Sequence, residues 1–381
     1  MADPDSPVIA RVAKGVAAIP AAQWDAVAGG DDPFLSHAFL SAMEESGSVG
    51  GRSGWQSAPI CIDGADGVLA GAIPAYVKAH SQGEYVFDHG WADAWIRAGG
   101  DYYPKLQIAV PFTPVPGRRL LSADSAHWPA LIAAAEALVQ HNGLSSAHAT
   151  FIGADQVEAF AAAGWLIRQG SQFHWFDRGY GDFDGFLGAL SSRRRKDIRK
   201  ERASAQSAVR IEQLSGGAIS EAHWDVLWAC YQDTGARKWG QPYLTRAAFS
   251  LLGQRMADRI LLLIAYQDGH PIAAALNLIG ADALYGRYWG CLVELPNLHF
   301  ELCYYQAIDF ALAHGLSRVE AGAQGGHKLA RGYEPVPTFS AHYIPHAGFR
   351  AAIADFLDRE NAAVDQETEW LAGQVPFKRE G

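Results

Sequence analysis

The hydrophobic and polar positions of this chain follow two different periods, which alternate from one end of the sequence to the other. Apolar residues spaced by three or four positions predict helices, whereas short apolar or alternating runs predict strands. The predicted helices cover residues 21–27, 37–46, 130–141, 155–163, 192–207, 222–235, 245–256, 302–314 and 349–370. The predicted strands cover residues 58–62, 68–78, 106–110, 147–151, 173–177, 209–214, 260–267, 272–279, 283–289, 318–321 and 341–344. The pattern therefore predicts a fold that mixes helices with strands.

The order of these elements is repeated in the two halves of the chain. Each half has helices, a hairpin, a further strand, a long helix and then another strand. The two long helices are similar in sequence, since residues 133–146 read AAAEALVQHNGLSS and residues 307–318 read AIDFALAHGLSR. A chain of 381 residues also exceeds the size at which a single hydrophobic core stops growing. We predict an internal duplication with domains at residues 1–170 and 171–381, the second carrying most of the candidate site residues.

Composition and charge narrow the classes of function. The net charge is −10 and the pI is near 5.8, which makes the chain a poor general binder of nucleic acids, because attraction to phosphates supplies most nonspecific affinity. An anionic ligand must therefore meet a local basic patch. The four cysteines are far apart and form no C-x-x-C pair, which disfavours a zinc ribbon or a disulfide framework and fits a reducing compartment. They are Cys61, Cys230, Cys291 and Cys303.

Targeting and metal signals are missing from the sequence. Residues 1–7 are acidic and have neither a basic nor an apolar signal-peptide region. Apolar runs such as residues 260–265 are too short to span a bilayer. No H-E-x-x-H, nucleophile-elbow or dinucleotide fingerprint is present. We expect a cytoplasmic protein with no membrane span and no metal.

A basic segment at residues 191–202 is the first candidate for a binding site. It holds seven of the 31 Lys and Arg residues within ten positions. Guanidinium groups match phosphate oxygens in pairs, so the segment predicts a phosphate or diphosphate clamp. The alternative is a solvated helical face stabilised by ion pairs along the helix. The clamp candidates are Arg193, Arg194, Arg195 and Arg199.

The densest mixture of reactive side chains lies at residues 299–306 and 320–331, where folding alone would favour apolar groups. His299, Glu301 and Glu320 are the candidate general bases, although Glu301 could equally be a first-turn carboxylate favoured by the helix dipole. The glycines at 322–326 do not have the P-loop spacing, and predict either a loop approached closely by a ligand or a plain connection. The candidate ligand contacts here and in the strand at 283–289 are Arg287, Trp289, Tyr304, Tyr305, Gln324, His327, Lys328 and Arg331.

The first half offers weaker candidates. Residues 83–91 and 102–106 combine aromatic and charged side chains. His89 and Lys105 are candidates for a pocket, while aromatic packing is the alternative explanation. We predict that they contribute to substrate binding.

These segments together resemble the FemAB-like, or peptidoglycan biosynthesis/recognition, family of predicted N-acyltransferases, and the resemblance extends over nearly the whole chain. It rests above all on residues 191–202, 284–291, 298–307 and 320–333. The resemblance implies an α/β (α+β) fold of two tandem GNAT-like acyltransferase domains, each a mixed twisted sheet flanked by helices. It also implies that arginines of the basic helix hold the phosphates of a muropeptide-like acceptor.

The reaction implied by the resemblance is attack of an amine on an activated acyl carbonyl, with oxyanion donors near residues 289–291 or 325–326. The donor stays open between acyl-CoA and aminoacyl-tRNA. The coiled-coil arm of the Fem ligases has no counterpart in this sequence, which disfavours tRNA, and the usual acetyl-CoA pyrophosphate loop is also missing. The alternative is a non-catalytic GNAT-like protein that recognises a peptidoglycan precursor.

Overall fold

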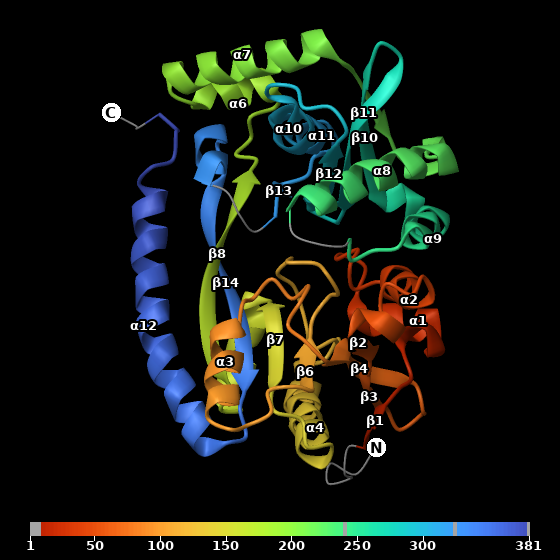
Figure 1. The fold of residues 1–381 in the computed structure, drawn as a ribbon, viewed down its shortest axis with the longest axis vertical. Helices are drawn as coiled ribbons and strands as arrows, with labels where there is room; N and C mark the ends of the chain where they lie inside the picture. The colour runs from red at the N-terminus through yellow and green to blue at the C-terminus, as the bar shows by residue number, and fades with distance from the viewer. Residues whose placement is uncertain (1–8, 239–241, 323–325, 379–381) are drawn as a thin grey trace. The chain divides into compact units, whose positions relative to one another are not determined.

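The chain folds into two compact units, which a computed structural model describes over residues 9–238, 242–322 and 326–378 (Figure 1). Unit 1 comprises Met1–Gly170 and Pro337–Asp365, and unit 2 comprises Ser171–Val336 and Gln366–Gly381. Sequence reasoning assigned the whole of residues 171–381 to one domain. Pro337–Asp365 instead pack with unit 1, because they contain a strand that pairs with the sheet of that unit.

Unit 1 contains two sheets. β1 (Ala10–Val12), β3 (Ile60–Asp63) and β4 (Leu69–Ile73) form an antiparallel sheet of three strands. The second sheet contains, in order, β2 (Trp55–Ser57), β5 (Ala75–Lys78), β6 (Lys105–Ile108), β7 (Ala147–Ile152) and β14 (Glu334–Tyr343). β6 and β7 are parallel, and the other neighbours are antiparallel. The helices are α1 (Ala21–Ala28), α2 (His37–Glu45), α3 (His89–Arg97), α4 (Trp128–His141), α5 (Val157–Ala162) and most of α12 (Ala347–Ala372).

Unit 2 is built on one mixed sheet. Its strands are, in order, β8 (Leu166–Phe176), β13 (Arg318–Glu320), β12 (Ala283–Cys291), β11 (His270–Ile279), β10 (Ile260–Gln267) and β9 (Arg210–Leu214). β12 and β13 are parallel, and the other neighbours are antiparallel. The helices are α6 (Phe183–Ala189), α7 (Ser192–Ala208), α8 (Glu221–Lys238), α9 (Arg246–Met256), α10 (Leu298–Phe300) and α11 (Gln306–His314). A π-helical turn, Glu301–Tyr305, joins α10 to α11.

Each unit contains the same type of connection, in which a helix links two parallel strands. Helix α4 links the parallel strands β6 and β7, and helix α11 links the parallel strands β12 and β13. Parallel neighbours require such a crossover. These two helices are the pair whose sequences are similar, and each buries its apolar side in the core of its own unit. The predicted α/β fold, with mixed sheets flanked by helices, is confirmed.

Two predicted elements differ from the structure. The helix predicted at residues 302–314 is interrupted by the π turn, since Glu301 is wholly buried and held by polar side chains that a helical period does not reveal. The strand predicted at 341–344 is the end of the longer β14, whose first half contains Pro335 and Pro337. Proline cannot donate to a sheet ladder, so its presence hid that half. Among the helices that the structure describes, none has the length and apolarity needed to cross a membrane.

Candidate functional site

Two cavities of unit 2 meet at Trp289 and His299, which line both of them. The larger cavity has a volume of about 370 Å³, and its wall includes Cys291, Glu294 and Leu298. The smaller cavity has a volume of about 180 Å³. Its other side chains include Asn277, Arg287, Tyr288, Cys303 and Tyr304. His299 thus lies in a wall that the two cavities share.

A β-bulge shapes the smaller cavity. Leu276 pairs with Tyr288, but the next residue, Asn277, pairs with Gly286, so that Arg287 is an extra residue on β12. Bulges re-aim side chains and are frequent beside functional sites. A Cβ at Gly286 would lie 3.4 Å from Oδ1 of Asn277, which is an ordinary contact distance. The bulge brings Arg287 into the cavity wall.

The aromatic part of the wall comes from β12, α10 and the π turn. Ring centroids of His299 lie 5.3 Å from Trp289 and 5.4 Å from Tyr304. Glu301 is buried and accepts hydrogen bonds from Arg202 at 3.2 and 3.3 Å, from Gln206 at 2.8 Å and from Gln306 at 2.7 Å. Single π turns are rare and are frequent at functional sites. Glu301 therefore holds the turn to helix α7 rather than facing either cavity.

A third, basic cavity of about 360 Å³ lies along α7 and is lined by Arg194, Lys200 and Arg331, together with Asp197 and Glu201. Arg331 donates to both oxygens of Glu201 at 2.9 Å and to the hydroxyl of Tyr305 at 3.0 Å. The wall contains three cationic side chains and two carboxylates, so its formal net charge is +1, which suits an anionic ligand.

Phe300 connects the basic cavity with the histidine. The guanidinium carbon of Arg331 lies 3.4 Å from the centre of the Phe300 ring. That ring lies 5.6 Å from His299 and 6.1 Å from Tyr304. The ring of Phe300 therefore lies between Arg331, in the wall of the basic cavity, and His299, in the wall shared by the other two cavities.

The end of the glycine-containing loop adds two groups. Nε2 of His327 lies 2.8 Å from the hydroxyl of Tyr304, and burial together with nearby Arg331 lowers the pKa of His327. Lys328 is buried and donates to the carbonyl of Gly322 at 2.6 Å. Burial lowers the pKa of Lys328 to about 8. Gln324 and Gly325 lie outside the described residues.

The other candidates of unit 2 are engaged in structural contacts or face solvent. Glu320 is buried, accepts from Arg318 at 2.9 Å and lies 3.6 Å from His174. Burial lowers the pKa of His174 to about 3. Tyr305 is buried and donates to Glu201. The remaining arginines of α7 are Arg193, which is exposed, Arg195, which is half-buried, and Arg199, which makes an exposed 2.9 Å ion pair with Asp184.

The two first-half candidates belong to unit 1. His89 is exposed at the start of α3, beside the ring of Phe87. Lys105 is wholly buried and forms ion pairs with Glu84 and Asp88. Neither residue lines the cavities described above.

Sequence reasoning overlooked several residues of the site. Phe300 and Cys303 gave no signal, because apolar residues on a helix usually belong to the core. Asn277 could have been found, since it is a single polar residue inside the apolar run AALNLI of β11 and is buried there. Within the described ranges, no group of three or more His, Cys, Asp and Glu residues could hold a metal ion.

Comparisons with known proteins agree with this architecture. Residues 15–379 match the FemAB-like family, described as peptidoglycan biosynthesis/recognition. No curated protein matches the sequence. FemX is similar in structure at 12% identity and a TM-score of 0.56, covering 88% of this chain and 98% of its own.

Two further solved structures have a similar fold. One is the C-terminal domain ascribed to a lysylphosphatidylglycerol synthetase from Agrobacterium fabrum, at 9% identity and a TM-score of 0.56, covering 89% of this chain and 95% of that domain. The other is L-PGS from Bacillus licheniformis, at 9% identity and a TM-score of 0.50, covering 92% and 99%. At these identities the likeness is one of fold.

Proposed function

The chain belongs to the FemAB-like family of peptidoglycan biosynthesis/recognition, and from that premise we propose that it is an N-acyltransferase acting on an amine of a phosphate-bearing acceptor. The group transferred would be an acyl or an aminoacyl group, and a cell-wall precursor would be the acceptor. The observation that carries the proposal is the position of His299 in the wall of two cavities, one ring away from a basic cavity.

His299 is assigned the role of general base. An amine that attacks an acyl carbonyl must lose a proton, and imidazole has an ordinary pKa suited to accepting it near neutral pH. Of the three candidate bases, His299 is the one that lines the cavities described above. Glu301 is surrounded by donors and Glu320 is held by Arg318, so we assign them to positioning. Glu301 would act through the π turn, which contains Tyr304 and directly follows α10 with His299.

The basic cavity is assigned to the phosphates of the acceptor. Arg194, Lys200 and Arg331 line it, and guanidinium groups bind phosphate oxygens through paired, charge-assisted hydrogen bonds. Binding there would bring the rest of the acceptor past Phe300 toward His299. Such positioning converts a reaction between two molecules into one within a complex.

The acyl oxygen is assigned to the end of β12. β13 pairs over its whole length with Ala283–Tyr285, the first three residues of β12, and ends there. Backbone N–H groups of residues 289–291 lie beyond that point, beside the wall that contains Trp289. Fixed backbone donors near a developing oxyanion are a common source of catalysis. The donor, acyl-CoA or aminoacyl-tRNA, would enter there.

The first experiment is a ligand screen. Thermal stabilisation of the purified protein by acetyl-CoA, longer acyl-CoAs, a UDP-linked muropeptide and charged tRNA identifies donor and acceptor, because a ligand of the native state raises the midpoint. Mass spectrometry of the acceptor then detects the transferred group. Stabilisation by the muropeptide without transfer from any donor would favour the non-catalytic precursor-binding protein instead.

Variants then test the assigned roles. His299→Gln should lower turnover by about 10²–10⁴ without weakening binding of the acceptor. His270→Gln, which changes an exposed histidine at the start of β11, is the matched control and should retain full activity. Arg194→Ala should raise KM for the phosphate-bearing acceptor and leave kcat nearly unchanged. Full turnover by His299→Gln would remove the catalytic assignment.

A further inference from the structure

One face of the second sheet of unit 1 is both buried and polar. Lys78 of β5 pairs with Lys105 of β6, Gln107 of β6 pairs with His148 of β7, and His148 pairs with His342 of β14. Residues paired in this way share a face, and all five are at most 2% exposed. The opposite face is apolar and packs against α4. Four neighbouring strands therefore present ionisable side chains to the interior of unit 1.

Unit 2 provides an internal comparison. Its sheet has an equivalent face, turned away from the crossover helix α11, where Leu276 pairs with Leu262 and Tyr288. The ring of Tyr288 packs against Tyr231 of α8 and Phe249 of α9. The duplicated fold is thus stable with apolar residues on this face. Burying charges is costly even when they are paired, so the polar face of unit 1 calls for a reason other than folding.

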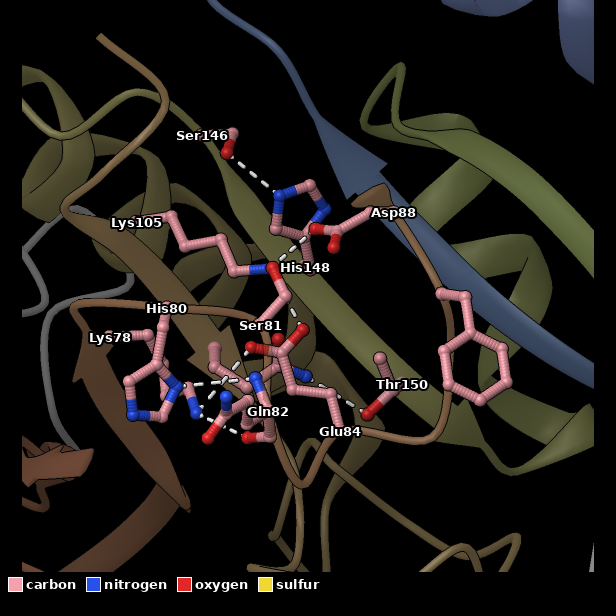
Figure 2. A network of polar contacts seen from close by, with 12 residues as sticks. Lys78, His80, Ser81, Gln82, Glu84, Asp88, Lys105, Ser146, His148 and Thr150 are labelled. Atoms are coloured by element: carbon pink, nitrogen blue, oxygen red, sulfur yellow. Dashed lines mark hydrogen bonds and ion pairs between the residues drawn. The ribbon is translucent and has the colours of Figure 1, made fainter. Parts of the chain in front are cut away.

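A covering segment, residues 79–88, supplies the counter-charges (Figure 2). The ammonium of Lys105 donates to Ser81 and Glu84, each at 2.8 Å, and to Asp88. The ammonium of Lys78 donates to the carbonyl of Gln82 at 2.8 Å and lies 3.7 Å from Oε1 of Glu84. The side chains of both lysines and both carboxylates are at most 3% exposed.

Three oxygens of this cluster accept no hydrogen bond from the described residues: Oδ1 of Asp88, Oε1 of Gln107, and Oε1 of Glu84, which has only the 3.7 Å ion pair with Lys78. All three are fully buried acceptors. A buried acceptor without a partner costs free energy and is uncommon in native proteins. The cluster therefore has an excess of acceptors, which a group with several N–H donors would satisfy.

We propose that unit 1 binds a primary ammonium group at this cluster, between the second oxygens of Glu84 and Asp88. The ligand class is a small primary amine or the amino group of a larger molecule. Its ammonium would alternate with that of Lys105 around the two carboxylates. The covering segment is one layer thick, since Gln82 and Phe87 face solvent while Glu84 and Asp88 point inward. The site does not depend on the reaction proposed for unit 2.

Charge balance gives the site a distinctive pH dependence. Burial, partly offset by Glu84, lowers the pKa of Lys78 to about 7. Burial raises the pKa of Glu84, against the opposing effect of Lys105. While Glu84 and Asp88 are ionised and Lys78 is neutral, the two carboxylates and Lys105 carry a net charge of −1, which one ligand cation neutralises. A proton on Lys78 and the ligand thus compete, and the coupling is reciprocal.

The other ionisable groups facing Lys78 do not produce the same dependence. Burial lowers the pKa of His148 to about 3 and that of His342 well below its usual value, so both are neutral between pH 6 and 8. Burial and Lys78 lower the pKa of His80. Burial, together with Asp88, raises the pKa of Tyr102. Burial opposes ionisation of Asp88, but Lys105 outweighs it and keeps the pKa of that carboxyl below its usual range.

Calorimetric titration of the whole protein with n-butylammonium chloride tests the proposal. Butyltrimethylammonium, which has the same charge but no N–H donors, is the control ligand. We expect the primary amine to bind at pH 8 and about tenfold more weakly at pH 6, as competition with a group of pKa about 7 requires. Equal binding of the two cations, no binding of either, or affinity independent of pH would overturn the proposal.

Two variants of Lys78 sharpen the test, once circular dichroism has shown that they are folded. Lys78→Met removes the competing charge and should make butylammonium binding independent of pH between 6 and 8. Lys78→Arg keeps the charge and should abolish binding at both pH values. Unchanged pH dependence in Lys78→Met would overturn the assignment, and the comparison of ligands on the unaltered protein decides the matter if neither variant folds.

Discussion

Replacing Glu301 by alanine should loosen the link between helix α7 and the π turn. The change leaves donors of Arg202, Gln206 and Gln306 without the carboxylate that they now share. Removing one partner of a buried ion pair costs about 3–5 kcal/mol. Arg202 keeps a second partner in Asp309, and its side chain is 15% exposed, which places the expected cost near the lower end, at about 3 kcal/mol.

Hydrogen exchange followed by mass spectrometry measures this cost locally, which suits a chain of two units better than a global unfolding midpoint. A loss of about 3 kcal/mol corresponds to a protection about a hundredfold lower in peptides from α7 and residues 301–305. Asp184→Ala is the matched control, because its ion pair with Arg199 is exposed and exposed pairs contribute little.

A double substitution separates lost pairing from lost packing. Glu301→Leu combined with Arg202→Met removes both charges and keeps apolar volume, so protection should recover most of the way, since apolar replacement of a buried ion pair is often neutral or stabilising. Protection of Glu301→Ala within twofold of the unaltered protein would show that the carboxylate is not holding the turn, and the positioning role would fall.

Three further predictions follow from burial. Burial lowers the folded-state pKa of His148 to about 3, so below pH 6.5 the unfolded chain binds a proton at this residue and the folded chain does not. The free energy of unfolding should therefore fall from pH 6.5 toward pH 3, by at most about 1.4 kcal/mol per pH unit for this group. Thermal melting at a series of pH values should show a shallower fall for His148→Gln. A Cβ at Gly290 would lie 2.0 Å from a backbone oxygen of α8, so Gly290→Ala should lower Tm by several degrees, whereas Gly188→Ala, with open space around it, should not. Burial raises the pKa of the Cys61 thiol to about 11, so iodoacetamide at pH 8 should label Cys303 in the cavity wall well before Cys61, as peptide mapping would detect.

Elements that bury one face were readily predicted from the sequence. The helix predicted at residues 130–141 is α4, Trp128–His141, and the hairpin predicted at 260–279 is formed by β10 and β11. In these segments periodicity and turn residues agree. Hydrophobic periodicity does not predict the structure where polar contacts determine the backbone conformation, as in the π turn around Glu301. It also does not predict strands whose partners come from distant segments, such as β14.

Some of the residues singled out from the sequence lie together in the structure. His299 and Trp289, singled out by the unusual mixture of residue types around them, line both cavities, and Arg287 and Tyr304 line the smaller one. Their roles stay predictions. The glycines were harder to interpret, because a glycine in a strand signals close approach without saying of what. Gly290 is approached by the backbone of α8 rather than by a ligand.

The dense charge of the second-half motif has a physical consequence for finding active sites from sequence. A buried charge must be paired, so a segment that carries one reactive charge must also carry or recruit its partners. Glu301 forms an ion pair with Arg202, and Arg331 forms one with Glu201. A motif rich in charged residues therefore contains more candidate catalytic residues than a reaction needs, because some of the charges serve as structural partners. A neutral imidazole costs far less to leave beside a cavity than a carboxylate does. In the role that we propose, this difference favours His299 over either glutamate as the group placed in a cavity wall.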